Sequence, residues 1–216
     1  AQMAEYVTLV VLRVYRELDA YAAQQREGRW QPRPRIAKSA FGIGILGFGV
    51  LGRAVAEVLA HFGFPLRAWS LSRKHSPGVE SFAGRAELGP FLAASQVLVC
   101  LLPSTHETRG LLDRTAFESL PPGAHLVNVA RGEIVVDEDL IAALDCGHLG
   151  SATLDVFRAE PLPSGHPFWH HPRITLTPHA SAVTLVEDAA LQVAAKIRRL
   201  ERGESVTGTV DRARGY

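Results

Sequence analysis

Three ionisable residues in the second half of the chain follow segments with the composition of buried strands. Arg131 comes directly after "LVNVA", Glu160 follows "ATLDVFRA" and His179 follows "ITLTP". The carboxyl ends of strands in a doubly wound sheet line one crevice, so we expect the three side chains to converge. Arg131 would bind a carboxylate and polarise a carbonyl. His179 would donate a proton, and Glu160 would fix the imidazole tautomer and favour its protonated form. Together these groups are suited to reducing a 2-keto acid by hydride transfer.

A hydride donor needs a binding site, and "FGIGILGFGVLG" (41–52) contains the pattern G-x-G-x-x-G in two frames. The frame that starts at Gly42 has no strand before it. The second frame lies between the strand-like "IGIL" and the helix-like "VLGRAVAEVLAHFG", which is the context of a dinucleotide fingerprint. A diphosphate is expected on the helix N-terminus, where free N–H groups and the helix dipole favour anions. The cofactor-binding residues predicted here are Gly47, Gly49, Val50, Leu51 and Gly52. The helix is expected to place Val50, Leu51, Ala54, Val55, Val58 and Leu59 on one side.

The end of the next strand bears on the choice of cofactor. An NAD site usually has an acidic residue there, but "LRAWSLSRK" has Ser70, followed by Arg73 and Lys74. Hydroxyls and cations would hold a 2′-phosphate that a carboxylate would repel, so the sequence favours NADP and makes NAD less favoured. The alternative is that Arg73 and Lys74 belong to a solvated loop. Asp155 points toward the same sheet edge and could accept a hydrogen bond from a nicotinamide amide.

The elements that position these residues alternate between strand and helix. Short apolar runs predict strands at 43–46, 66–70, 97–101, 126–129, 151–154 and 174–176. Helices are predicted near 50–62, 86–94, 106–118, 137–146 and 185–202. The strands show little polar alternation, as expected when both faces of a sheet are covered. The fold class predicted is therefore α/β, a doubly wound parallel sheet of the Rossmann type.

The chain starts with a segment, 3–25, that reads as one long amphipathic helix. We expect residues 1–27 to be a connecting helix, 28–184 the dinucleotide-binding domain, and 185–216 a C-terminal helix and tail. The apolar stripe of the first helix needs a surface to cover. We expect that surface to belong to a second copy of the chain, which predicts a homodimer.

Composition excludes several function classes. The net charge of the 216 residues is +1, which gives no reason to expect nucleic acid as a partner. The longest apolar runs are too short to span a membrane. Cys100 and Cys146 are far apart in sequence and predict two reduced thiols in a cytosolic protein rather than a disulfide. His166, His170, His171 and His179 lack the spacing of metal ligands, so no metal site is predicted.

Longer stretches resemble a known family. "GILGFGVLG", "LLPSTHETRGLL", "LVNVARGEIVVDEDLIAALDCGHLGSATLDVFRAEPLP" and "HPRITLTPHASA" are similar to the D-isomer-specific 2-hydroxyacid dehydrogenases. "GFPLRAWSLSRK", "FWHHPRITLTPH" and "GTVDRARGY" resemble its branch of glyoxylate/hydroxypyruvate reductases. The resemblance implies NADPH as cofactor, and glyoxylate and hydroxypyruvate as substrates. It implies catalytic roles for Arg131, Glu160 and His179, places Asp155 and the backbone around Ala130 at the nicotinamide, and lines the cofactor cleft with Leu102 and Pro103.

The resemblance also implies an N-terminal substrate domain, which is largely absent from this sequence. Two rival hypotheses therefore stay open. One is a nucleotide-binding module without turnover, and the other is an NAD-dependent dehydrogenase of a different 2-hydroxy acid. For the chain as given, we expect cofactor binding with little or no turnover.

Overall fold

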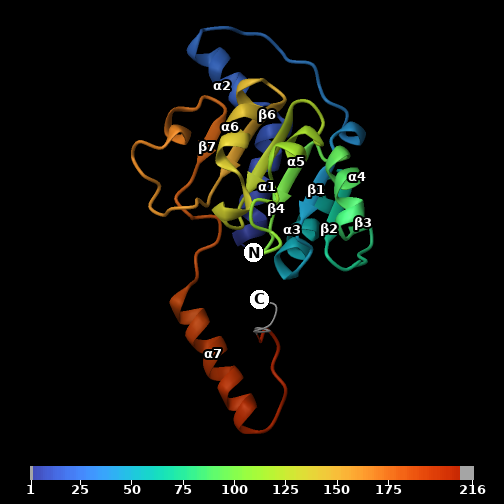
Figure 1. Ribbon diagram of the computed structural model, residues 1–216, viewed down its shortest axis with the longest axis vertical. Helices are drawn as coiled ribbons and strands as arrows, with labels where there is room; N and C mark the ends of the chain where they lie inside the picture. Colours follow the sequence, from blue (N-terminus) through green and yellow to red (C-terminus); the bar gives the residue numbers. More distant parts are fainter. Residues whose placement is uncertain (1, 210–216) are drawn as a thin grey trace. The chain divides into compact units, whose positions relative to one another are not determined.

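The computed structural model describes residues 2–209. The chain divides after Ser181 into two compact units. The first unit holds a parallel sheet with helices, and the second holds α7 (Val186–Glu201), as labelled in Figure 1. The predicted C-terminal helix and tail, 185–216, falls in the second unit, and its residues 210–216 lie outside the described residues.

The sheet of the first unit has seven strands, all parallel, in the order β3-β2-β1-β4-β5-β6-β7. Along the chain the strands are β1 (Ile43–Leu46), β2 (Leu66–Ser70), β3 (Val79–Ala83), β4 (Val97–Cys100), β5 (Ala124–Asn128), β6 (Leu149–Leu154) and β7 (Ile174–Leu176). The chain runs outward from β1 in one direction to β3, then crosses to β4 and continues to β7. This reversal beside β1 makes a topological switch point, so the doubly wound fold predicted from sequence is confirmed.

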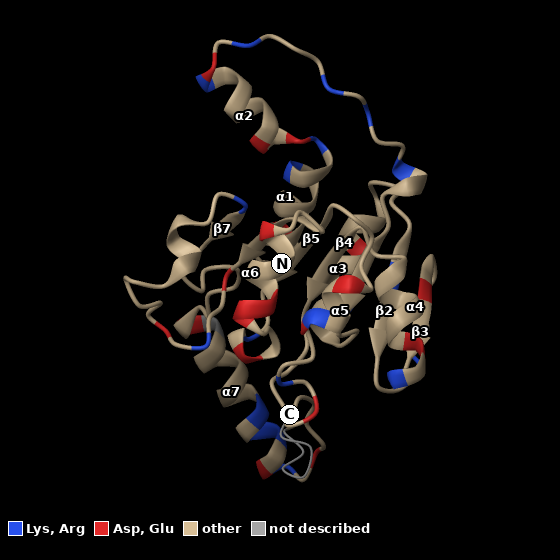
Figure 2. Cartoon of the chain, turned by 45° about the horizontal axis from the view of Figure 1, so that its top comes forward, with Lys and Arg blue, Asp and Glu red and all other residues tan. Residues whose placement is uncertain are grey.

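Helices and short 3₁₀ turns connect the strands. The α-helices of the first unit are α1 (Gln2–Tyr15), α2 (Leu18–Arg26), α3 (Val50–Ala60), α4 (Leu88–Ala93), α5 (Arg114–Glu118) and α6 (Asp137–Asp145). The 3₁₀ turns are η1 (Lys38–Ala40), η2 (Arg85–Glu87), η3 (Gly132–Ile134) and η4 (Pro167–His170). Figure 2 shows basic and acidic residues on many of these elements, consistent with the small net charge.

Two apolar layers, one on each face of the sheet, form the core. Alternate strand residues such as Ile43 and Ile45 pack with α1 and α3 on one face. Their neighbours on the opposite face, such as Leu98 and Leu126, pack with α4, α5 and α6. Each fully buried valine or leucine contributes about 1.5–3 kcal/mol relative to an exposed one. Coverage of both faces explains why the strands lack polar alternation.

The N-terminal helix differs from its prediction in two ways. It is two helices, because Glu17 adopts a left-handed conformation (φ 52°) between α1 and α2. The apolar stripe of α1, with Val7, Val10 and Val11 buried, packs on this chain's own sheet and α3 rather than on a partner. α1 therefore belongs to the same compact unit as the sheet, and its stripe gives no support for a dimer.

Two further elements were mispredicted. The edge strand β3 was missed because it is short, only partly buried and carries Glu80, so it does not read as a buried apolar run. The helix predicted over 106–118 is formed only over α5, where Asp113 caps the helix by accepting from the Ala116 N–H at 2.9 Å. Residues 106–111 are turns and irregular backbone instead.

Candidate active site

The glycines after β1 shape the first part of the site. Gly47 has φ 110°, a region that side chains rarely adopt, and a Cβ there would lie 2.7 Å from the Leu101 backbone after β4. A Cβ on Gly52 would lie 2.2 Å from the Gly47 carbonyl oxygen. Gly49 differs from both, because a Cβ there would meet no atom within 4 Å. Gly47 and Gly52 thus close the turn, and Gly49 leaves open space in front of the backbone.

α3 begins directly after Gly49, and no side chain caps its N-terminus. Uncapped N–H groups at this end are suited to bind an anion. Val50 is 86 % exposed and Leu51 is 50 % exposed, so they lie free at this end of the helix. Of the residues predicted to share one side of this helix, Val55 and Leu59 are buried, whereas Val50, Leu51 and Val58 are exposed. The buried face of α3 is formed by Gly52, Val55, Ala56 and Leu59, because the helix turns these positions toward the sheet.

The glycines of the rejected frame have a packing role. A Cβ on Gly42 would lie 2.3 Å from the Arg67 guanidinium, and one on Gly44 would lie 2.0 Å from the Ser95 hydroxyl oxygen. Both positions need glycine because neighbouring groups pack directly on the strand. Packing therefore explains the second occurrence of the motif.

At the end of β2, the residues predicted to select the cofactor differ in their contacts. Ser70 is buried, and its hydroxyl donates to the Ser72 carbonyl at 2.8 Å. The Arg73 guanidinium forms an ion pair with Glu87 and donates to the Ser81 carbonyl. The Ala83 N–H, with help from Arg73, lowers the pKa of Glu87. Among residues 2–209, the Lys74 ammonium has no ion pair. Arg73 must leave Glu87 before it can meet a phosphate, whereas Lys74 is available.

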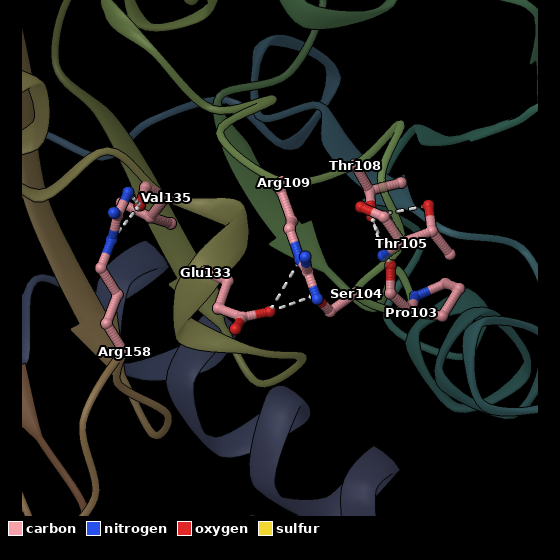
Figure 3. A network of polar contacts seen from close by, with 8 residues as sticks. All are labelled: Pro103, Ser104, Thr105, Thr108, Arg109, Glu133, Val135 and Arg158. Carbon is pink, nitrogen blue, oxygen red and sulfur yellow. Dashed lines mark hydrogen bonds and ion pairs between the residues drawn. The ribbon is translucent and has the colours of Figure 1, made fainter. Parts of the chain in front are cut away.

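The loop after β4 carries Leu102 and Pro103, which the resemblance placed in the cofactor cleft. Leu102 is buried beside the Gly47 turn. The Thr108 hydroxyl donates to the Pro103 carbonyl at 2.6 Å and accepts from the Thr105 N–H at 2.8 Å (Figure 3). The loop is thereby folded back on itself next to the glycine turn.

A second set of contacts joins this loop to the one after β5. Arg109 donates to Glu133 at 3.2 Å, and Ser104 also donates to Glu133 (Figure 3). These contacts, led by the Ser104 hydrogen bond, lower the pKa of Glu133. The Gly110 N–H donates to the Glu133 carbonyl at 2.9 Å. Sequence reasoning missed this link because its members look like surface residues.

The loop after β5 presents Ala130 and Arg131. Asn128 at the end of the strand is buried, accepts from the Ala130 N–H at 3.2 Å and donates to the Arg131 carbonyl at 3.1 Å. Gly132 packs so closely on the next loop that a Cβ would lie 2.0 Å from the Phe157 carbonyl carbon. The backbone at Arg131 is thus fixed on both sides, while its side chain is exposed. The asparagine inside the apolar run "LVNVA" is the sequence signal that could have predicted these backbone contacts.

His179 and Glu160 are brought together at the ends of β7 and β6. The Nδ1 atom of His179 lies 2.7 Å from Glu160 Oε2, and Glu160 Oε1 accepts from the Phe157 N–H at 2.9 Å. Partial burial raises the pKa of Glu160. The His179 and Phe157 hydrogen bonds and the charges of His179 and Arg131 outweigh it, so the pKa lies below its ordinary value. The contribution of Arg131 puts its guanidinium within electrostatic reach of the pair.

A pocket of about 610 Å³ borders this pair. Its apolar lining includes Phe157, Leu162, Trp169 and Leu176, beside His179 and Glu160 themselves. Because Nδ1 of His179 is held by Glu160, the other ring nitrogen, Nε2, is left to exchange a proton with a bound molecule. The arrangement can therefore donate a proton to a developing alkoxide.

Asp155 lies at the end of β6 with its side chain fully buried. Its Oδ1 accepts from the Ala180 N–H at 2.8 Å, and its Oδ2 accepts from the Ser181 N–H at 2.9 Å. Within the chain, this carboxylate therefore binds the loop that carries His179. Its predicted contact with a nicotinamide amide stays a prediction.

The residues that the structure describes give little support for a metal site, a membrane-spanning helix or a reactive thiol. No cluster of His, Cys, Asp and Glu there could hold a metal ion. No described helix is both long and apolar enough to cross a membrane. Cys100 is buried and Cys146 exposed, and both are free thiols, as the sequence predicted. Burial raises the pKa of Cys100 to about 12, so this thiol stays protonated and unreactive.

Comparison with known proteins is consistent with this geometry. The model of the NAD-binding domain of D-isomer specific 2-hydroxyacid dehydrogenases matches residues 8–181. A D-isomer specific 2-hydroxyacid dehydrogenase from Xanthobacter autotrophicus Py2, crystallised with NADPH and MES, is 44 % identical with a TM-score of 0.95. The match covers 100 % of this chain and 89 % of that one.

Two other solved structures match over the whole chain and 69 % of their own length. An NADPH-dependent glyoxylate/hydroxypyruvate reductase from Sinorhizobium meliloti, with NADP and sulfate, is 35 % identical with a TM-score of 0.96. A probable 2-hydroxyacid dehydrogenase from Rhizobium etli CFN 42, with NADP, HEPES and L(+)-tartaric acid, is 34 % identical with a TM-score of 0.95.

Proposed function

Because the chain belongs to the D-isomer-specific 2-hydroxyacid dehydrogenase family, we propose that it serves NADPH-dependent reduction of small 2-keto acids, such as glyoxylate and hydroxypyruvate, to 2-hydroxy acids. The observation that carries this proposal is the 2.7 Å contact between His179 and Glu160, at the same sheet edge as the glycine turn before α3. A proton donor and a dinucleotide turn on one edge are the two parts that ketone reduction by hydride transfer needs.

Each residue has a distinct role in this proposal. A bound nicotinamide cofactor supplies the hydride. Arg131 binds the substrate carboxylate and polarises the carbonyl, since a guanidinium pairs with a carboxylate through two parallel hydrogen bonds. His179 gives its Nε2 proton to the carbonyl oxygen as charge develops there, and Glu160 holds the ring in the protonated form. Asn128 keeps the Arg131 backbone in place.

Residues of this chain would form a binding site that fits the cofactor. Gly49 leaves room for a diphosphate next to the uncapped end of α3, and Val50, Leu51 and Ala130 are placed around the same edge. We assign Ser70, Arg73 and Lys74 to the 2′-phosphate, which favours NADP over NAD. The relatives crystallised with NADPH or NADP support this choice.

We further propose that the protein forms a homodimer in the cytoplasm. Large apolar side chains remain exposed on α1, on α2 and in the segment after α2. Leu9 is 65 %, Leu18 is 52 % and Trp30 is 98 % exposed. Side chains of this kind are stabilised when a partner covers them. The two free thiols support a reducing compartment. Light scattering that gives the mass of a monomer would contradict the dimer.

The decisive experiment for the reaction is glyoxylate reduction, followed by the loss of NADPH absorbance, in a protein that also carries the substrate domain implied by the family resemblance. We expect His179→Ala to slow the reaction by roughly 100- to 10,000-fold, because general acid catalysis contributes that much. His170→Ala is the matched control, since His170 is an exposed histidine of η4 outside the pair. Equal rates for the two variants would exclude His179 as the proton donor.

A further inference from the structure

The loop that carries His179 is held in an unusual conformation. His179 has φ 53°, in the left-handed region that residues other than glycine rarely occupy. Its N–H donates to the Asp155 carbonyl at 2.8 Å and to the Thr177 carbonyl at 3.0 Å. Such a conformation persists only where the surroundings fix it. The position of the imidazole therefore depends on the contacts around Asp155 and Thr177.

A chain of hydroxyl contacts connects this loop to the N-terminal helix. The Thr177 hydroxyl donates to Asp155 Oδ1 at 2.5 Å, and the Tyr6 hydroxyl oxygen lies 2.6 Å from Thr177 Oγ1. Because the single proton of the Thr177 hydroxyl goes to Asp155, the Tyr6 hydroxyl donates to Thr177. Burial raises the pKa of Tyr6, which keeps its hydroxyl protonated as a donor.

The carboxylate of Asp155 thus receives donors from both sides of His179. Thr177 binds it two residues before the histidine, and Ala180 and Ser181 bind it directly after. Tyr6 lies on α1, which packs on the sheet through its buried stripe. The rigid helix therefore provides the outer end of the chain of contacts, and hydrogen bonds linked in this way strengthen one another.

We propose that Tyr6 and Thr177 are positioning residues, which act through Asp155 to hold His179 against Glu160. The proposal rests on the proposed role of His179 as proton donor. Glu160 contacts the imidazole and Arg131 acts on Glu160, whereas Asp155 and Tyr6 belong to the contacts that hold the loop backbone. Among residues 2–209, only Glu160 forms a hydrogen bond with the ring, so movement of the loop affects the ring mainly through that one contact.

Tyr6→Phe and Thr177→Val test this proposal, because each removes a hydroxyl with little change in size. We expect kcat for glyoxylate to fall on the order of 10-fold, as for the loss of one buried hydrogen bond, with the Kd for NADPH unchanged. We also expect the NMR chemical shift of the His179 Nδ1 proton, which reports the hydrogen bond with Glu160, to change toward the value in Glu160→Gln. Thr177→Ser keeps a hydroxyl and should restore both properties.

Tyr15→Phe is the matched control, since Tyr15 lies on the same helix and its hydroxyl donates to the Ile36 carbonyl at 3.1 Å, away from the site. The proposal is overturned if Tyr6→Phe behaves like Tyr15→Phe in both kcat and the NMR signal of the His179 Nδ1 proton. It is also overturned if Thr177→Val lowers only the melting temperature. If the wild-type protein with its substrate domain fails to reduce glyoxylate, the proposed function is wrong, while the NMR signal of His179 still decides whether Tyr6 positions the ring.

Discussion

Glu160 uses both carboxylate oxygens, one for the His179 ring and one for the Phe157 N–H. Against the effect of partial burial, the hydrogen bonds with His179 and the Phe157 N–H lower the pKa of Glu160, so a charged carboxylate lies beside the ring, and such a charge attracts a cationic imidazole. Reduction needs the protonated ring, so its rate should fall as pH rises. Glu160→Gln removes the charge and should move this fall to lower pH, while part of the maximal rate at acid pH remains.

The measurement is kcat/KM for glyoxylate as a function of pH in wild type and Glu160→Gln. Glu118→Gln provides the control, because Glu118 is an exposed carboxylate of α5. Profiles that fall at the same pH in all three proteins would show that Glu160 does not tune His179.

The cations after β2 give the second prediction for single residues. Arg73→Ala and Lys74→Ala should each weaken NADPH binding by about 1–3 kcal/mol and leave NADH binding almost unchanged, since only NADPH carries the phosphate. Glu87→Gln should have the opposite effect, because it releases Arg73 from its ion pair. Fluorescence titration gives the Kd of each cofactor. Equal losses for NADPH and NADH would refute the assignment.

At the scale of elements, Gly49 and Gly52 in the turn between β1 and α3 have different roles, which substitution by alanine can distinguish. Gly52→Ala places a Cβ 2.2 Å from the Gly47 carbonyl oxygen. We therefore expect a loss of about 1–3 kcal/mol in the free energy of unfolding. Gly49→Ala meets no atom within 4 Å, so folding stability should be kept while NADPH binding weakens. Urea unfolding and cofactor titration of both variants check this. A stable Gly52→Ala would show that the turn relaxes.

Some elements can be recognised from the sequence and others cannot. The bounds of β1, β2 and β7 were predicted because each is a short apolar run beside a turn. The break at Glu17 was not, because glutamate is a good helix former and no glycine or proline beside it marks the end of a helix. Arg131, Glu160 and His179 were predicted to converge from their places after strands, and the structure brings Glu160 into contact with His179. Tyr6 and Thr177 are 171 residues apart, and a contact over that separation leaves no local pattern.

At the scale of the whole molecule, a buried histidine of β5 makes the free energy of unfolding sensitive to acid. His125 lies between the hydroxyls of Ser151 and Thr153, at 2.7 and 3.0 Å, and burial lowers its pKa to about 4. The unfolded chain binds this proton near its ordinary pKa of about 6.5, so stability should fall as pH drops from about 6.5 to about 4. The loss amounts to about 3 kcal/mol at about 1.36 kcal/mol per pKa unit.

Urea unfolding at several pH values in this window measures the effect. His125→Gln should flatten the dependence, because no proton is then taken up at this position on unfolding. His170→Gln, at an exposed histidine, should leave the dependence as in wild type. A wild-type stability that stays constant through this window would contradict the prediction.

The 2.6 Å contact between Tyr6 and Thr177 joins the first helix of the first unit to the loop after its last strand. α1 and the loop after β7 thus meet at neighbouring points, an arrangement that tolerates circular permutation. A short peptide could join these two points, and the exposed segment 28–37 could supply new ends, without breaking any strand pair of the sheet. The order of the strands in the sheet therefore does not depend on which segment of this unit supplies its chain ends.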